Sequence, residues 1–297
     1  MQVTIIPASS SVGRATVRAL LASPSQPVVR AIYRDVEKAP EEFRQNPRFQ
    51  AVRGDVGSGD LDFGASEAVL YVPPMVVDGS DVDEFATRAA TNVKRAIRNA
   101  GTVKRLISQS ALGSNREGNG ILRINTITDE LLRDAAPRTF IIRPCTFYDT
   151  WKPALEAVLK GAGSFESYLS PVDWKVPMVS VRDIASHCVR ILLDDVGDLS
   201  NDDVWVFGPR LYSSEDVREA IETATGKKVE VKSVPREDLA SWWGKHVPEK
   251  YVPELTEFTL FQLEGGAVTA DYTYDDKTVR CGRELVEEFR EWVSQTH

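Results

Sequence analysis

Residues 2–35, QVTIIPASSSVGRATVRALLASPSQPVVRAIYRD, decide the fold class. Val3, Ile5 and Ile6 form a short apolar run, and a second run follows at residues 28–33. Between the two runs, residues that suit one buried helix face recur at a spacing of three to four: Val12, Thr16, Val17, Leu20 and Leu21. Strand, loop, helix and strand in this order predict a βαβ unit, and therefore a parallel sheet.

The loop of this unit carries a reduced nucleotide-binding fingerprint. Such units have a glycine-rich turn after the first strand. If the motif is spaced G-x-x-G-x-x-G, its three positions are Pro7, Ser10 and Gly13, so one glycine remains. Pro7 cannot adopt a positive φ, but a helix N-terminus still offers free amide groups to a phosphate. We therefore predict a phosphate site, with a plain serine-capped turn as the alternative. The predicted cofactor residues of this loop are Ser9, Ser10, Ser11, Val12 and Gly13.

The end of the second strand bears on the choice of dinucleotide. Arg34 follows Gly13 by 21 positions. A basic side chain there can pair with the 2′-phosphate of NADP, whereas an acid accepts a hydrogen bond from the ribose of NAD. The neighbouring Asp35 keeps NAD open, and a solvated charged surface is the remaining alternative.

Composition excludes several classes of protein. The chain has 297 residues, 42% of them hydrophobic, and a net charge of −8, which argues against general nucleic-acid binding. We see no secretory signal and no apolar run of 18 residues, so we expect no membrane span. The three widely spaced cysteines suit reduced thiols, and the three histidines lack metal-ligand spacing. We expect a cytoplasmic monomer or homodimer without a metal.

Strand and helix patterns alternate through the first half of the chain, which indicates a doubly wound parallel sheet. A long helix is predicted over residues 81–100, stopped by Gly101. Residues 1–150 are expected to form the core domain, and 179–208 to return to it. Residues 151–178 and 209–297 are expected to form mainly a smaller mixed α/β lobe that binds substrate. Further strands are predicted within FQAVRGD, EAVLYVPP, VKRLISQSALG, RTFIIRP, DDVWVFGP and KKVEVKSV, and further helices within GILRINTITDELLRDAA, VSVRDIASHCVRILLDD and SSEDVREAIETATG.

The order and spacing of several landmarks resemble one known family. They are VRAIYRD, RGD at 53–55, LYVPP, KRLISQSA, FIIRPCTFYD, KVPMVSVRDIA, VFGPRLYSSEDV and ETATGKKV. The chain resembles an NmrA-like member of the atypical short-chain dehydrogenase/reductase group, near isoflavone-reductase-like proteins and fungal ergot-alkaloid reductases. The resemblance implies a Rossmann-type domain that binds NADP and a smaller C-terminal substrate domain.

The resemblance also implies roles for particular residues. By the resemblance, Arg34 binds the 2′-phosphate, and Asp55 contacts the adenine amino group. The remaining cofactor positions are Val72, Pro73 and Pro74 beside the ribose and phosphate, then Ser108, Gln109, Ser110, Pro144, Cys145 and Phe147 near the nicotinamide, and Asn125. The implied substrate-binding residues are Phe147, Tyr148, Trp151 and Trp174. The structural alternatives are a strand-end turn for Asp55, strand termination for the prolines and core packing for the aromatic residues.

The catalytic positions depart from the short-chain dehydrogenase pattern. The chain has no Tyr-x-x-x-Lys. Isoflavone-reductase-like relatives carry a lysine about 18 residues before the Arg-Pro of the sixth strand, and counting back from Arg143 gives Asn125. Asn125 can donate a hydrogen bond but cannot deliver a proton, and an ordinary helix-surface amide is its alternative. Asp149 is the nearest acid and could serve as a proton donor if buried, although a helix N-terminal acid is its simpler interpretation.

These observations predict an NADP(H)-dependent reductase acting on a hydrophobic small molecule. The resemblance suggests an alkaloid imine or iminium, or an activated alkene, in fungal-type secondary metabolism. Two alternatives remain open: a redox-neutral isomerase or cyclase on the same scaffold, and a regulatory protein that senses NADP without catalysis.

Overall fold

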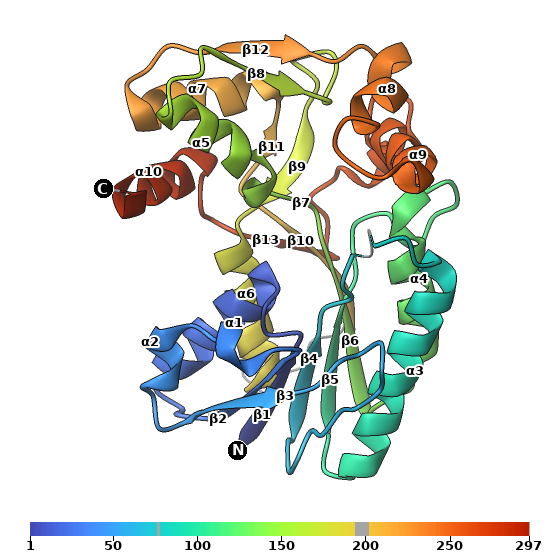
Figure 1. Cartoon of the computed structure of the whole chain (residues 1–297). Helices are drawn as coiled ribbons and strands as arrows, with labels where there is room; N and C mark the ends of the chain where they lie inside the picture. Colours follow the sequence, from blue (N-terminus) through green and yellow to red (C-terminus); the bar gives the residue numbers. More distant parts are fainter. Residues whose placement is uncertain (76–77, 194–201, 297) are drawn as a thin grey trace. The chain divides into compact units, whose positions relative to one another are not determined.

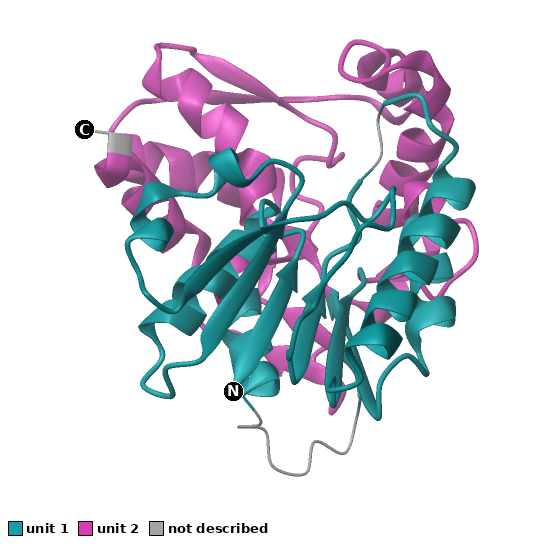
Figure 2. Cartoon of the chain, turned by 60° about the horizontal axis from the view of Figure 1, so that its bottom comes forward, with its two compact units in different colours: residues 1–111, 123–143, 184–204 teal, residues 112–122, 144–183, 205–297 magenta. Residues whose placement is uncertain are grey.

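The computed structural model describes residues 1–75, 78–193 and 202–296. The chain divides into two compact units, coloured separately in Figure 2. Unit 1 contains residues 1–111, 123–143 and 184–204, and unit 2 contains residues 112–122, 144–183 and 205–297.

The main sheet has eight strands in the order β13-β10-β6-β5-β4-β1-β2-β3 (Figure 1). The strands from β1 to β6 pair in parallel, so their carboxyl ends lie at one edge. The spatial order of these six strands, reversed at β1 and β4, is that of a doubly wound Rossmann-type sheet. This confirms the predicted fold class. The strands of this sheet are β1 (Gln2–Ile6), β2 (Val28–Tyr33), β3 (Phe49–Arg53), β4 (Ala68–Tyr71), β5 (Arg105–Gln109), β6 (Arg138–Pro144), β10 (Asp203–Phe207) and β13 (Thr278–Arg280).

The long predicted helix is α3, and its ends follow capping chemistry. The Asp81 carboxylate accepts hydrogen bonds from the amides of Asp83 and Glu84, which satisfies two donors that have no partner inside the helix. Gly101 ends the helix at a φ of 67°, a conformation that costs glycine no steric strain. The helices of unit 1 are α1 (Ser11–Ala22), η1 (Val36–Lys38), α2 (Glu41–Arg44), α3 (Val82–Ala100), α4 (Arg123–Leu132) and most of α6 (Val181–Leu192).

Unit 2 contains two small sheets, β11-β9-β7 and β12-β8. Its apolar core includes Tyr148, Trp151, Val217, Leu239 and Phe289. Its strands are β7 (Thr146–Phe147), β8 (Ser164–Ser167), β9 (Val176–Val179), β11 (Leu211–Tyr212) and β12 (Glu230–Ser233). Its helices are η2 (Gly120–Leu122), η3 (Tyr148–Trp151), α5 (Lys152–Leu159), α7 (Ser214–Thr225), η4 (Arg236–Asp238), α8 (Leu239–Trp243), η5 (Glu249–Tyr251), α9 (Val252–Gln262), η6 (Ala267–Asp271) and α10 (Leu285–Thr296).

The units differ from the expected domains in residues 112–122, 144–150, 179–183 and 205–208, which group with unit 2. The first of these segments is fixed to unit 2 by close packing and charge. A Cβ on Gly120 would lie 2.1 Å from the Glu254 carbonyl oxygen, so only glycine lets η2 approach α9 this closely. Arg116 also forms a two-pronged ion pair with Asp271, with N–O distances of 2.6 and 2.5 Å. Neither contact has a sequence-local signal.

None of the described helices is both long and apolar enough to cross a membrane. Within the described ranges, the structure contains no group of three or more His, Cys, Asp or Glu side chains arranged to hold a metal ion.

Candidate functional site

The carboxyl edge of unit 1 gathers predicted cofactor residues from separate segments. The loop after β1, Arg34 after β2, Asp55 after β3, residues 72–74 after β4 and residues 108–110 at the end of β5 all follow strands that pair in parallel. Ligands of doubly wound sheets bind outside the carboxyl ends of the strands, where the strand order reverses. Here that point lies between β1 and β4, next to the serine loop.

The serine loop is a tight turn into α1. The Ser10 hydroxyl caps the helix: it accepts a hydrogen bond from the Gly13 amide at 3.0 Å and donates to the Pro7 carbonyl oxygen at 3.0 Å. A Cβ on Gly13 would lie 2.5 Å from that same carbonyl oxygen and 2.7 Å from the Ser10 hydroxyl. The surviving glycine is therefore the position at which a side chain would disrupt the loop.

Three amides of this loop remain available. Among the described residues, the structure gives no hydrogen-bond acceptor to the backbone N–H groups of Ser9, Ser11 and Val12. Ser9 and Ser11 are exposed, and the positive end of the α1 dipole lies at the same place. The loop thus keeps the donors of an anion site although two of its three glycines are missing.

The two charged residues after β2 have different surroundings. Asp35 caps η1, and its Oδ1 accepts a hydrogen bond from the Glu37 amide at 3.1 Å. Arg34 is exposed and has no hydrogen bond or ion pair with any described residue, although its charge contributes to the lowered pKa of Asp78. The acid is partly committed to a local turn, whereas the cation is available to an anionic ligand.

A second cation, Arg14, belongs to the same surface and was missed by the sequence analysis. It follows Gly13 in the first turn of α1 and is exposed. Burial raises the pKa of Tyr33 at the end of β2 to about 12, while the guanidinium groups of Arg14 and Arg44 act against this rise. Arg14 therefore lies near the end of β2. The available signal was a basic residue directly after the last fingerprint position.

Asp55 and the proline segment have local structural roles. The Asp55 Oδ1 accepts a hydrogen bond from the Gly57 amide at 2.8 Å, which is the strand-end turn named as its alternative. The Val72 amide donates to the Ile6 carbonyl oxygen at 2.9 Å, so strand pairing continues one residue beyond β4. Pro73 and Pro74 are half-buried and end this pairing because proline has no N–H.

A buried charge network lies beneath the end of β5. The Ser110 hydroxyl donates to Asp129 Oδ2 at 2.7 Å and accepts from Arg143 Nη1 at 3.0 Å. Arg143 is 1% exposed and also pairs with Asp129 at 2.8 Å and with Asp203 at 2.7 Å. Burial raises the pKa of Asp129, and the Arg143 charge and hydrogen bonds act against this rise. The Ser110 hydroxyl proton is therefore directed at Asp129 and not toward a substrate oxygen.

Asn125 and Asp129 lie one turn apart on the same face of α4, and both are buried. The burial of Asn125 excludes the helix-surface alternative. Ser108 is fully buried, and its hydroxyl has no hydrogen-bond partner among the described residues. Gln109 Oε1 also lacks one. Asp129 was missed by the sequence analysis, although its spacing of four from Asn125 was a readable signal.

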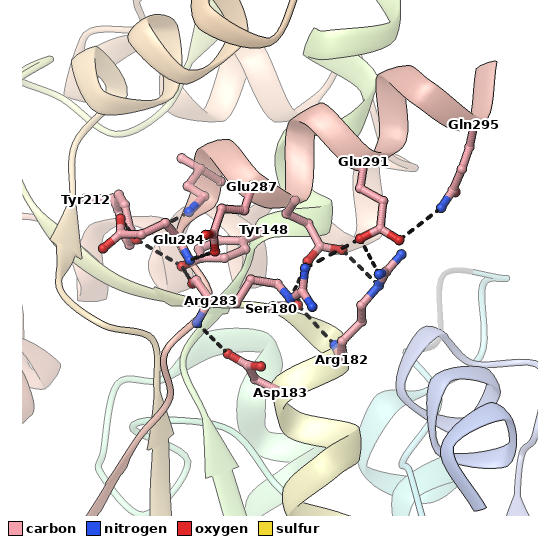
Figure 3. Close-up of polar contacts among 12 residues, drawn as sticks. Tyr148, Ser180, Arg182, Asp183, Tyr212, Arg283, Glu284, Glu287, Glu291 and Gln295 are labelled. Carbon is pink, nitrogen blue, oxygen red and sulfur yellow. Dashed lines mark hydrogen bonds and ion pairs between the residues drawn. The ribbon is translucent and has the colours of Figure 1, made fainter. Parts of the chain in front are cut away.

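The predicted substrate residues of unit 2 are packed tightly. Tyr148 is fully buried and Trp151 is 3% exposed, so both lie in the core of unit 2. The Tyr148 hydroxyl shares its one proton between two acceptors, the Arg283 carbonyl oxygen at 2.9 Å and the Tyr212 hydroxyl at 3.1 Å, and Tyr212 donates to Glu284 at 2.8 Å (Figure 3). These partners account for Tyr148 as a core residue, which was the structural alternative for the aromatic set.

The indole of Trp151 donates to the Met178 sulfur at 3.3 Å, and that of Trp174 donates to the Gln262 carbonyl oxygen at 3.0 Å. Phe147 is half-buried and pairs with Val179 in the small sheet. Just before it, the Cys145 amide donates to the Val206 carbonyl oxygen at 3.2 Å, and the Pro144 carbonyl oxygen accepts from the Leu112 amide at 3.0 Å. These backbone groups are already bonded within unit 2.

Asp149 lies in η3, in a neighbourhood rich in charge. Burial raises its pKa, and Lys152 and Arg182 act against this rise. Arg182 also pairs with Glu288 and Glu291 of α10, while Ser180 donates to Glu288 at 2.8 Å (Figure 3). Glu288 is 3% exposed, and its pKa is raised by burial. The cluster anchors α10 within unit 2, and no catalytic role for Asp149 follows from it.

The whole chain matches one protein family. The NmrA-like family model matches residues 1–292, and the chain belongs to this family. No curated protein matches the chain.

Solved structures with the same fold include NADPH-dependent quinone oxidoreductase from Escherichia coli complexed with NADPH. It is 18% identical, with a TM-score of 0.75 over 99% of this chain and 100% of that chain. Citrobacter sp. triphenylmethane reductase is 17% identical, with a TM-score of 0.74 over the same shares. Leucoanthocyanidin reductase from Vitis vinifera is 16% identical, with a TM-score of 0.68, also over 99% and 100%. At these identities the similarity shows the fold.

Proposed function

We propose that the chain binds NADP(H) at the carboxyl edge of unit 1 and transfers hydride to a hydrophobic small molecule. The observation that carries the proposal is the serine loop: three amides without acceptors lie at the start of α1, in a turn that a Cβ on Gly13 would disrupt. The names of the structural neighbours, which include NADPH-dependent and NADP(H)-complexed reductases, support this assignment.

The residues present fit NADP(H). The amides of Ser9, Ser11 and Val12 and the α1 dipole would hold the pyrophosphate. Arg34, with Arg14 beside the end of β2, would hold the 2′-phosphate, since a charge-assisted hydrogen bond from a guanidinium suits this group. Asp35 already accepts a hydrogen bond from Glu37, which disfavours its use as a ribose ligand for NAD. The fit therefore favours NADP over NAD.

The bound dinucleotide supplies a hydride, and the described unit 1 residues near the end of β5 supply no evident acid. The Ser110 proton is engaged by Asp129, and Asn125 can orient a substrate through its amide but cannot deliver a proton. Ketone reduction normally needs a positioned acid. An iminium carbon needs none, because hydride addition gives a neutral amine, and an activated alkene can take its later proton from water. We therefore propose as the acceptor an imine in its protonated form, an iminium ion or an activated alkene, as in alkaloid-type secondary metabolism.

The test uses NADPH deuterated at C4, in separate 4R and 4S forms, with a panel of cyclic iminium ions and activated alkenes. The proposal expects oxidation of NADPH, followed at 340 nm, and, with one of the two labelled forms only, one deuterium per product at the former iminium or β-carbon. Product without label and without cofactor oxidation would establish a redox-neutral isomerase or cyclase. NADPH binding without turnover of any acceptor in the panel would favour the regulatory alternative. Gly163→Ala is the matched folded control, because a Cβ at Gly163 has no atom within 4 Å.

A further inference from the structure

Helix α9 of unit 2 is apolar on two sides. Leu255 is 4% exposed and does not line the outer surface, whereas Leu260 is 40% exposed. Val252, Pro253 and Leu260 line the same region of the outer surface. A surface helix with one packed face normally turns polar residues to the other side. The outer side of α9 therefore has an apolar character that the core of unit 2 does not require.

This outer side forms one wall of a groove of about 640 Å³, within the range of small-molecule sites. The other walls come from Ala240 of α8, residues 117–118 and residues 266–267, all in unit 2. The walls are fixed by the close packing of Gly120 on α9 and by the Arg116–Asp271 ion pair. The groove is therefore formed in advance, which lowers the entropic cost of binding.

The charge of the groove is of one sign. Glu117 and Glu257 are the ionisable residues that line it, and no Lys or Arg is found among its described lining residues. A Cβ on Gly118 would lie 3.8 Å from Glu257 Oε1, which places this carboxylate beside the loop that carries Glu117. Arg116, the basic residue next to Glu117, is engaged by Asp271. Apolar walls with two carboxylates are complementary to an apolar molecule that bears a positive charge.

We propose that this groove is a binding site for an apolar small molecule carrying a delocalised or quaternary cation. The site belongs to unit 2 alone, and its occupation requires neither the dinucleotide nor turnover. The proposal is independent of the reductase activity and can fail or hold separately from it.

Thioflavin T, an apolar benzothiazolium cation, is the probe, and its uncharged benzothiazole analogue is the matched neutral ligand. Fluorescence titration of the full chain is expected to give saturable binding with a preference for the cation. Glu117→Gln and Glu257→Gln are each expected to weaken cation binding about two- to fivefold, and the double variant more, because each exposed charge pair contributes modestly. Binding of the neutral analogue should stay unchanged. Glu264→Gln is the control for net charge, since Glu264 is exposed and does not line the groove.

A steric variant tests the location. Ala267 is exposed and lines the groove, so Ala267→Trp should fill part of it and weaken both ligands at least fivefold, with unchanged thermal unfolding. Equal weakening of the cation by Glu264→Gln and Glu257→Gln would show a general charge effect and overturn the proposal. Unaltered binding in Ala267→Trp would also overturn it. Concentration-dependent dimerisation of the wild type that Ala267→Trp abolishes, without saturable dye binding, would assign the groove to a second copy of the chain instead.

Discussion

Gly13→Ala places a methyl group where the phosphate loop has no room. The new Cβ would lie 2.5 Å from the Pro7 carbonyl oxygen and 2.7 Å from the Ser10 hydroxyl. The hydroxyl can rotate away only by giving up the Gly13 amide that it caps, and the carbonyl cannot rotate. Lengthening the distance between the new Cβ and the Pro7 carbonyl oxygen to an ordinary contact moves the loop by about 0.9 Å. A displacement of about 1 Å can weaken the function of a precisely positioned site by up to ~100-fold. We therefore expect NADPH to bind about 10- to 100-fold more weakly.

The same substitution should destabilise the protein by about 1–3 kcal/mol through overpacking, offset by about 1 kcal/mol from the better helix propensity of alanine. Calorimetric titration with NADPH and thermal unfolding with and without the ligand measure both effects. Gly163→Ala, with open space around its Cβ, should leave both unchanged. NADPH affinity within twofold of wild type in Gly13→Ala would refute the role assigned to this loop.

Three further outcomes follow. Ser10→Gly removes the α1 cap but releases the Gly13 amide. We therefore expect thermal unfolding to show a stability loss of a few tenths of a kcal/mol, and NADPH binding to be unchanged or tighter. A sharp loss of NADPH affinity would show that the Ser10 hydroxyl is itself a ligand. Asn125→Ala should lower kcat no more than about tenfold, through lost orientation, whereas complete loss of turnover in a folded variant would show an essential role. Burial lowers the pKa of His187 from 6.5 to about 4, so the stability linked to its neutral form is complete above pH 6.5 and is lost as the pH falls toward 4. His187→Gln should reduce this acid sensitivity, measured by denaturant unfolding at pH 7 and pH 4.5. An unchanged pH dependence would exclude His187 as its source.

The fold could be predicted from local patterns because the strands and the longer helices of unit 1 carry their own signals, whereas the short η1 and α2 were not predicted. The apolar runs mark β1 and β2, and Asp81 and Gly101 mark the ends of α3. The predicted helix within SSEDVREAIETATG is α7, and its start carries a local Ser-x-x-Asp pattern: the side chains of Ser213 and Asp216 each bond the backbone of the other in a capping box. These features depend on residues close together in the chain.

The rest of the site depends on contacts between distant residues. Arg143 meets Asp129 and Asp203 across 14 and 60 residues, and this network decides where the Ser110 proton points. The hydrogen bonds of Tyr148 with Tyr212 and Arg283 connect residues that are 64 and 135 positions apart in the chain. No local pattern separates such a core tyrosine from one that lines a pocket. The grouping of residues 112–122 with unit 2 depends in the same way on the contact of Gly120 with α9.

The claim that unit 1 holds NADP(H) through Arg34 is tested most directly by calorimetric titration of the wild type and Arg34→Ala with NADPH and NADH. One charge-assisted contact to the 2′-phosphate contributes about 1.5–3 kcal/mol, so the wild type should prefer NADPH by about 10- to 100-fold. Arg34→Ala should lose most of this preference while its affinity for NADH stays unchanged. Equal affinity of the wild type for the two dinucleotides, or an equal loss for both in Arg34→Ala, would contradict the account.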